Sequence, residues 1–108
     1  MNLLALRVNE DNFNKEVLEA EVPVLVEFYS DSCVPCKQMS PILGDLEEEY
    51  EDKLKIVKIN VNFDLQLAEA HMVMGSPTFL FFKNGEEKNR LRGITKKPEL
   101  IEIINSIL

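Results

Sequence analysis

The two cysteines of this chain, Cys33 and Cys36, constrain its fold more than any other feature, because they lie between two regular elements. An apolar run at residues 24–29, rich in β-branched and aromatic side chains, precedes them and is typical of a strand buried on both faces. A stretch with helical periodicity follows them. We therefore predict that a buried strand ends just before the cysteines and that a helix begins at them.

The spacing of the cysteines suits reversible disulfide chemistry. Cysteines at this spacing in the first turn of a helix have Cα atoms about 5 Å apart, a separation that a disulfide tolerates. The free N–H groups and positive dipole end of the helix stabilise a thiolate, so Cys33 is the predicted nucleophile. Cys36, one turn inside, is expected to be more buried. Pro35 fits the first turn, where its missing N–H costs no hydrogen bond.

Length and charge limit the classes of protein to consider. The 108 residues suit one domain with its own core, so we expect a single domain over residues 1–108. A net charge of −7 speaks against a nucleic-acid partner. The sequence has neither an apolar run of membrane-spanning length nor a basic or apolar leader, so we expect a cytoplasmic protein without membrane association. In that compartment a cysteine pair is more often catalytic or metal-binding than structural.

The remaining elements follow from hydrophobic periodicity and turn residues. Strands are expected at residues 3–8, 24–29, 54–61, 78–82 and 86–92, the last two joined by a hairpin at Asn84-Gly85. Two short helices are expected, one capped from residues 9–12 and carrying Phe13, Val17 and Leu18, the other at residues 64–71. The longest helix should run from the cysteines to Tyr50. Thr95 should cap the last helix, whose buried side chains are Leu100, Ile103, Ile104, Ile107 and Leu108.

Several separated motifs also occur in a recognisable order. They are Cys33-Val34-Pro35-Cys36-Lys37, Ser40-Pro41-Ile42-Leu43, Lys58-Ile59-Asn60, Ser76-Pro77-Thr78, Phe82-Lys83-Asn84-Gly85, and Gly93 before the last helix. With them the chain resembles the thioredoxin family over essentially its whole length. The resemblance implies an α/β fold in which a mixed five-stranded central sheet is flanked by four helices. The implied order is strand, helix, strand, helix, strand, helix, strand, strand, helix.

The resemblance also implies reversible dithiol–disulfide exchange with protein substrates. In this reaction Cys33 attacks a substrate disulfide, and Cys36 resolves the mixed disulfide. Glu27 stands where the family usually carries a buried aspartate, and Lys58 matches its usual lysine partner. A carboxyl group in apolar surroundings has a raised pKa, so the implied role of Glu27 is to accept the proton of Cys36. Read alone, Glu27 could instead be an edge-facing surface residue, although its central place in the apolar run favours burial. Lys58 could be an ordinary strand lysine with an exposed tip.

Other positions are expected to tune the reaction and to contact substrates. Val34, where the family usually has glycine, and Pro35 would tune the redox potential of the pair. Tyr29 and Ser32 replace two tryptophans that usually flank the motif, and the proline matching Pro77 has a cis peptide bond in the family. The expected substrate-binding residues are Tyr29, Ser32, Ser76, Pro77 and Gly93.

The resulting prediction is a cytoplasmic thioredoxin-like reductant, a monomer that receives electrons from a thioredoxin-reductase-type donor and needs no cofactor beyond its disulfide. An oxidant or isomerase would use the same residues in the other direction, and a non-catalytic adaptor would use only the fold. The cysteines could also form a structural pair or half of a metal site. A zinc site needs about four ligands, and with His71 the only histidine, a metal site would require a second subunit.

Overall fold

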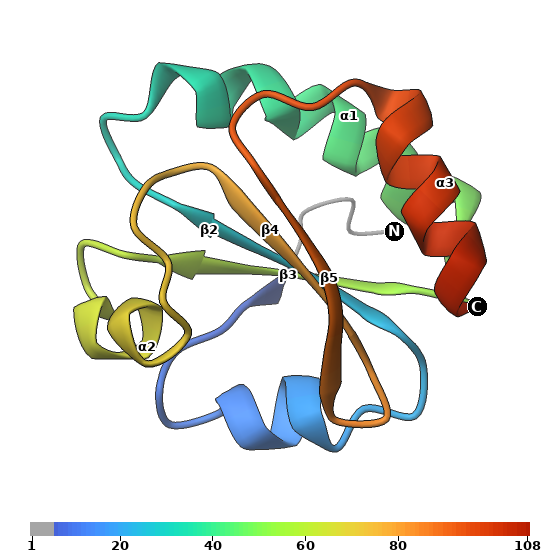
Figure 1. Cartoon of the computed structure of the whole chain (residues 1–108), viewed down its shortest axis with the longest axis horizontal. Helices are drawn as coiled ribbons and strands as arrows, with labels where there is room; N and C mark the ends of the chain where they lie inside the picture. Colours follow the sequence, from blue (N-terminus) through green and yellow to red (C-terminus); the bar gives the residue numbers. More distant parts are fainter. Residues whose placement is uncertain (1–5) are drawn as a thin grey trace.

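The computed structural model describes residues 6–108, which form a mixed sheet of five strands with helices on both faces (Figure 1). The elements are β1 (Leu6–Arg7), η1 (Asn14–Leu18), β2 (Val24–Tyr29), α1 (Val34–Glu49), β3 (Lys55–Asn60), α2 (Leu65–Ala70), β4 (Thr78–Lys83), β5 (Glu86–Arg92) and α3 (Lys97–Ile107). The strand order is β1-β3-β2-β4-β5. β2 pairs parallel to β3 and antiparallel to β4, so the expected fold class is confirmed.

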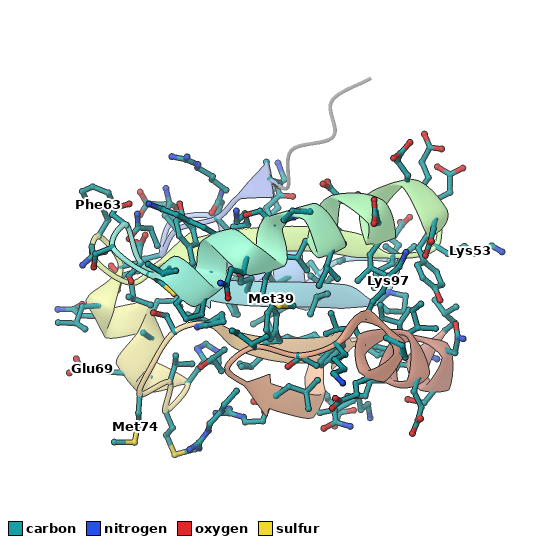
Figure 2. The ribbon with its side chains drawn as sticks, turned by 90° about the horizontal axis from the view of Figure 1, so that it is seen from above. Met39, Lys53, Phe63, Glu69, Met74 and Lys97 are labelled. Carbon is teal, nitrogen blue, oxygen red and sulfur yellow. A yellow bond between two sulfur atoms is a disulfide. The ribbon has the colours of Figure 1, made fainter. Side chains whose placement is uncertain are left out.

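The two faces of the sheet pack on different helices, because successive side chains of a strand point in opposite directions. One apolar cluster joins η1 and α2 to the sheet, and its members from β2 are Val24, Val26 and Phe28. The other joins α1 and α3 to the sheet, and it contains Leu25 of β2 together with Met39 of α1. Figure 2 shows Met39 on the side of α1 that faces the sheet. β2 is therefore buried on both faces, as its apolar sequence predicts.

The hairpin between β4 and β5 follows the prediction. Asn84 and Gly85 have φ angles of 53° and 78°, the left-handed conformation that a tight two-residue turn requires at both positions. Glycine is further needed at position 85, because a Cβ atom there would lie 3.0 Å from the carbonyl oxygen of Leu18. The turn thus also packs against the end of η1.

The expectations for the first strand and the first helix need correction. Residues 3–5 lie outside the described residues, and β1 covers Leu6–Arg7. Asn9 and Asn12 do not cap η1: the Oδ1 atom of Asn9 accepts hydrogen bonds from the backbone N–H groups of Asp11 and Asn12, and Oδ1 of Asn12 accepts one from Asn9 N–H. Asparagine side chains readily form such local turns, and here these turns replace the cap.

The last helix also begins and ends differently from the prediction. Thr95 does not cap α3, because its hydroxyl donates a hydrogen bond to the carbonyl of Gly93, and Lys96 occupies the cap position without a side-chain hydrogen bond. The helix ends at Ile107, and Leu108 is 47% exposed, so its expected burial was wrong. Leu100, Ile104 and Ile107 are buried as predicted, and Ile103 is partly buried.

Candidate active site

Cys33 and Cys36 form a disulfide at the start of α1, with their Cα atoms 5.2 Å apart. Cys33 is the N-cap residue, and its Sγ atom accepts a hydrogen bond of 3.0 Å from the backbone N–H of Cys36. A donor directed at this sulfur stabilises negative charge on it. The exposed fractions are 7% for Cys33 and 5% for Cys36, so the expected greater burial of Cys36 amounts to a small difference in this disulfide form.

A small polar network fixes the loop that leads from β2 to the cysteines. Asn60, at the end of β3, donates through Nδ2 to the carboxylate of Asp31 at 2.9 Å. The backbone N–H of Asp31 donates to Oδ1 of Asn62 at 3.0 Å, and the backbone N–H of Asn62 donates to Oδ1 of Asn60 at 2.9 Å. Sequence reasoning missed this network, because it depends on the parallel pairing that ends β2 and β3 side by side.

Glu27 lies in the middle of β2 and has no exposed surface. It points to the face covered by α1 and α3, in register with Lys58 of β3 and Phe79 of β4. Neither carboxyl oxygen has a hydrogen-bond partner among the described residues. Burial raises the pKa of Glu27 to about 7, although the charge of Lys58 acts to lower it. The expected burial of Glu27 is confirmed, and its carboxyl group can gain and lose a proton near neutral pH.

Lys58 links the buried carboxyl group to the surface beside Cys36. Its Nζ atom is 3.8 Å from Oε1 of Glu27, an ion pair too long to be a hydrogen bond. The same ammonium group lies 5.0 Å from the centre of the Tyr29 ring, and the Lys58 side chain is 26% exposed. An open pocket of about 200 Å³ is lined by Tyr29, Ser30, Asp31, Cys36, Lys37, Ser40 and Lys58. This pocket gives solvent a place between Lys58 and Cys36.

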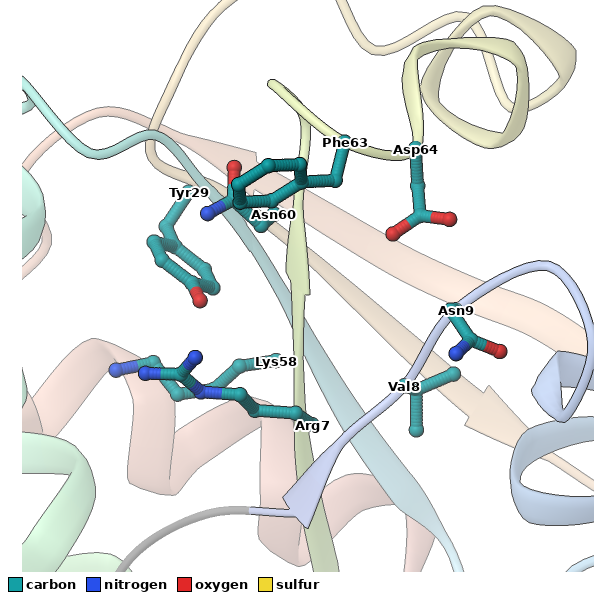
Figure 3. A pocket seen from close by; sticks show the side chains of 8 residues that line it. All are labelled: Arg7, Val8, Asn9, Tyr29, Lys58, Asn60, Phe63 and Asp64. Carbon is teal, nitrogen blue, oxygen red and sulfur yellow. The ribbon is translucent and has the colours of Figure 1, made fainter.

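A second open pocket, of about 160 Å³, is also lined by Tyr29 and Lys58. Its lining residues are Arg7, Val8, Asn9, Tyr29, Lys58, Asn60, Phe63 and Asp64 (Figure 3). Figure 3 shows the side chains of Tyr29, Lys58 and Arg7 directed toward one another. Arg7 and Lys58 are register partners on β1 and β3, so two cationic side chains meet at this edge of the sheet. Sequence reasoning did not single out Arg7, because the chain around it carries no motif.

The expected substrate-contact residues fall into two groups. Ser76, Pro77 and Gly93 line one pocket of about 270 Å³, and the Gly93 backbone N–H donates to the Pro77 carbonyl at 2.8 Å. The Ser76–Pro77 peptide bond is cis. Tyr29 lies beside Lys58, as described, and Ser32 is exposed in the loop before Cys33. A hydrogen bond of 3.2 Å between the hydroxyl groups of Ser30 and Ser76 joins the loop after β2 to the segment before β4.

The two residues between the cysteines differ in exposure. Val34 is 61% exposed and presents its side chain beside the disulfide, whereas Pro35 is partly buried in the first turn of α1. Neither side chain carries a charge or a hydrogen-bond donor. Over residues 6–108 no group of three His, Cys, Asp or Glu side chains is arranged to hold a metal ion, and no helix is long and apolar enough to cross a membrane.

Comparison with known proteins gives a consistent result. The family model for thioredoxin matches residues 5–106. A thioredoxin of Rickettsia felis is 36% identical over 102 residues, which cover 94% of this chain and 97% of that protein. Thioredoxin 1 of a Nostoc species is 33% identical over 104 residues, covering 96% of this chain and 97% of the relative. A chloroplastic M-type thioredoxin of spinach is 38% identical over 101 residues, covering 94% of this chain and 56% of that protein.

Proposed function

The chain belongs to the thioredoxin family, whose members exchange dithiols and disulfides with other proteins, and we propose that it works in the reducing direction. One observation carries this direction. The hydrogen bond to the Cys33 sulfur comes from the backbone of Cys36, and Val34 and Pro35 supply neither a charge nor a side-chain donor. With no donor beyond this backbone N–H among the described residues, the Cys33 thiolate is less stabilised than in strong oxidants, which stabilise their reduced form, so the dithiol gives up its electrons more readily.

The reaction conserves electrons in two displacement steps. The Cys33 thiolate attacks one sulfur of a substrate disulfide, so a mixed disulfide forms and one substrate thiolate leaves. Cys36 then loses its proton and attacks the Cys33 sulfur, which releases the second substrate thiolate and leaves the Cys33–Cys36 disulfide. Two electrons have passed to the substrate, and a thioredoxin-reductase-type donor returns two electrons to the disulfide.

Glu27 is the proposed acceptor of the Cys36 proton. Its pKa of about 7 lets the ionised form accept a proton and the neutral form release it at neutral pH. Lys58 favours the ionised form, because its ammonium group lies 3.8 Å from the carboxyl oxygen. Lys58 and Cys36 line the same open pocket, and in this proposal a water molecule there relays the proton.

Substrates would dock along the segment beside the cis peptide bond. The backbone of Ser76 can pair with an extended substrate strand, a form of β-augmentation. Tyr29, Ser32, Pro77 and Gly93 complete the proposed contact surface. Val34 and Pro35 would set the potential of the pair, since they determine what surrounds the Cys33 sulfur.

We further propose that the protein acts in the cytoplasm as a monomer, with no cofactor other than its disulfide. The substrates are disulfide-containing proteins, and neither nucleic acid nor membrane takes part.

The midpoint potential of the Cys33/Cys36 couple tests the direction. Titrated against a glutathione or dithiothreitol buffer, it should lie close to about −270 mV, the value typical of a reductant of this family. A value near about −120 to −180 mV would contradict the proposal, since oxidants and isomerases work in that range. Reduction of insulin by the dithiol form gives the corresponding activity.

A further inference from the structure

The segment from α2 to Pro77 begins with an unusual helix end. The backbone N–H groups of Met72 and Val73 donate to the carbonyls of Glu69 and Ala68, at 3.0 and 2.9 Å. This pattern closes a helix with a residue in the left-handed conformation, a place that glycine usually takes. Here the residue is Met72, with φ of 56°. A side chain at such a φ angle is strained, so the surrounding structure must hold this end of α2 in place.

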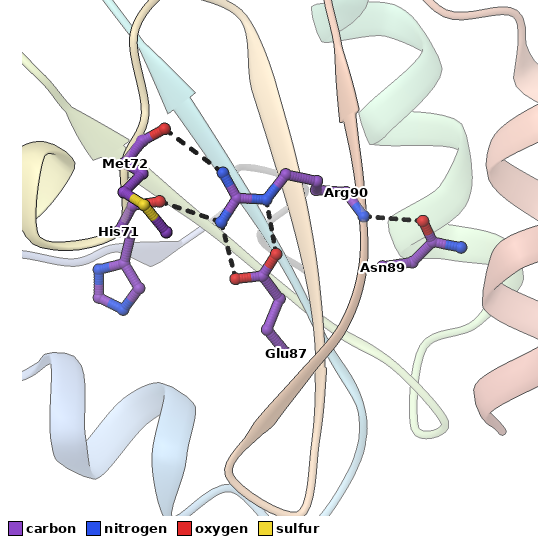
Figure 4. Close-up of polar contacts among 5 residues, drawn as sticks. All are labelled: His71, Met72, Glu87, Asn89 and Arg90. Atoms are coloured by element: carbon purple, nitrogen blue, oxygen red, sulfur yellow. Dashed lines mark hydrogen bonds and ion pairs between the residues drawn. The ribbon is translucent and has the colours of Figure 1, made fainter.

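Arg90 supplies that hold from the neighbouring edge strand. Its Nη2 atom donates to the carbonyl of His71 at 3.0 Å, and Nη1 donates to the carbonyl of Met72 at 3.4 Å. The same guanidinium group makes a two-pronged ion pair with Glu87, with bonds of 2.6 and 2.8 Å (Figure 4). The last carbonyls of a helix have no partner within it and attract positive charge. Arg90 therefore binds the end of α2 to β5, with Glu87 fixing its orientation.

The opposite end of the segment is anchored at the active site. The Ser76 hydroxyl is within 3.2 Å of the Ser30 hydroxyl, and the Thr78 hydroxyl donates to the carbonyl of Gly75 at 2.7 Å. Between the two anchors the chain presents two methionines, with Met72 71% exposed and Met74 89% exposed. Met74 also lines the pocket that contains Ser76 and Pro77. The position of this apolar surface beside the site is thus set from both ends.

We propose that Arg90 is a positioning residue for protein substrates, which holds segment 71–76 so that Ser76 and the methionines meet a substrate chain in a fixed place. The inference rests on the proposed function, since it concerns the docking of the same protein disulfides. Arg90 touches neither cysteine, so its effect is confined to substrates large enough to contact the segment. A small disulfide reacts at the Cys33 sulfur without using it.

The test compares one variant with a matched control. Arg90→Met keeps an unbranched apolar stem and removes the guanidinium group with all its side-chain hydrogen bonds. Lys97→Met removes two other ion pairs, which Nζ of Lys97 makes with Glu49 at 2.8 Å and with Asp45 at 3.8 Å, and which join α3 to α1. For both variants and the unmodified protein, the KM and kcat for insulin reduction and the rate with the small disulfide 5,5′-dithiobis(2-nitrobenzoic acid) are measured at a temperature where all three are folded.

We expect Arg90→Met to raise the KM for insulin about three- to tenfold, with kcat, the small-disulfide rate and the midpoint potential unchanged. Lys97→Met should change none of these. Arg90→Lys keeps the positive charge, but its single ammonium group cannot reach both carbonyls and the Glu87 carboxylate together as the branched guanidinium group does. Its KM for insulin should therefore lie between those of the unmodified protein and Arg90→Met. A fall in the small-disulfide rate parallel to that with insulin, or an equal change in Lys97→Met, would overturn the positioning role. So would an unchanged KM in Arg90→Met.

The proposed function can fail separately. An unmodified protein that oxidises reduced ribonuclease A but does not reduce insulin would refute the reducing direction. The effect of Arg90→Met is then measured in that oxidation, where a raised KM still supports the positioning role and an unchanged KM refutes it. Amide hydrogen exchange of Met72 and Val73, whose N–H groups close the end of α2, adds a direct test, because faster exchange in Arg90→Met than in Lys97→Met is required.

Discussion

β2 shows different chemistry on its two faces, although both are buried. Toward η1 and α2 it presents Val24, Val26 and Phe28, which pack in an apolar cluster. Toward α1 and α3 it presents Leu25 and then Glu27, a carboxyl group with no exposed surface and no hydrogen-bond partner among the described residues. The first face contributes only apolar packing to the core. The second contains a group that a core would ordinarily exclude.

The difference indicates where the fold gives up stability for function. Burying a carboxylate without a hydrogen-bond partner is costly. Burial therefore raises the pKa of Glu27 to about 7, so that the carboxyl group is neutral for part of the time. The cation paired with it, at 3.8 Å, belongs to the partly exposed Lys58. A leucine there would pack without this cost. The carboxyl group beside the helix of Cys36 therefore points to a role in proton transfer.

The largest effect should come from the purely structural face. Phe28→Ala removes a fully buried ring and should lower the free energy of unfolding by about 3–5 kcal/mol. The midpoint potential of the cysteine pair should stay the same, because the ring lies across the sheet from it. Urea unfolding and a redox titration measure the two quantities. A potential that moves with the loss of stability would show that the two faces are not independent.

The second prediction concerns the carboxyl group itself. Since the folded pKa of Glu27 is about 7 and that of an exposed glutamate is 4.5, the folded protein binds more protons between these values than the unfolded chain. The contribution of this group to the free energy of unfolding should therefore be fully present below pH 4.5. It should fall by roughly 3 kcal/mol in total as the pH rises to about 7, and level off above that pH.

Glu27→Leu should abolish this pH dependence. At pH 8 the variant should be more stable than the unmodified protein by roughly 2–3 kcal/mol, while insulin reduction at pH 7 slows by about tenfold or more. Urea unfolding at pH 5 and pH 8 and insulin turnover provide the measurements. A variant that is less stable at pH 8, or one that keeps full activity, would contradict the account.

A smaller effect should follow from Lys58. Lys58→Met removes the charge that lowers the pKa of Glu27, so the midpoint of the pH–rate profile should move upward, by up to about one unit. Lys55→Met is the matched control on the same strand, because Lys55 pairs with Glu16 of η1 on the opposite face. The midpoint of the pH–rate profile of Lys55→Met should not change. Equal shifts in both variants would show a general loss of positive charge rather than a local effect on Glu27.

Much of this comparison could be predicted from the sequence. The run at residues 24–29 predicted a strand buried on both faces, and the position of Glu27 in its middle predicted the burial of the carboxyl group. The spacing of Cys33 and Cys36 gave a Cα separation close to the observed 5.2 Å. These features depend on local periodicity, which a single sequence carries.

Features that depend on distant partners could not be predicted. Arg90 meets the end of α2 only because β5 lies at the edge beside β4, and nothing near Arg90 in the sequence indicates this. The wrong expectations for Asn12 and Thr95 have another cause. Each side chain found a nearby backbone partner that competed with the helix cap, and propensity alone does not decide between the two.

The pKa of Glu27 decides most directly whether its carboxyl group can accept the proton of Cys36. Carbon-13 NMR of the side-chain carboxyl carbon, in protein labelled at glutamate and assigned by comparison with Glu27→Gln, follows its titration in the disulfide form. We expect a midpoint near the value of about 7 that burial imposes. A midpoint close to 4.5, the value of an exposed glutamate, would mean that the carboxyl group is ionised throughout the neutral range and cannot take the proton of Cys36.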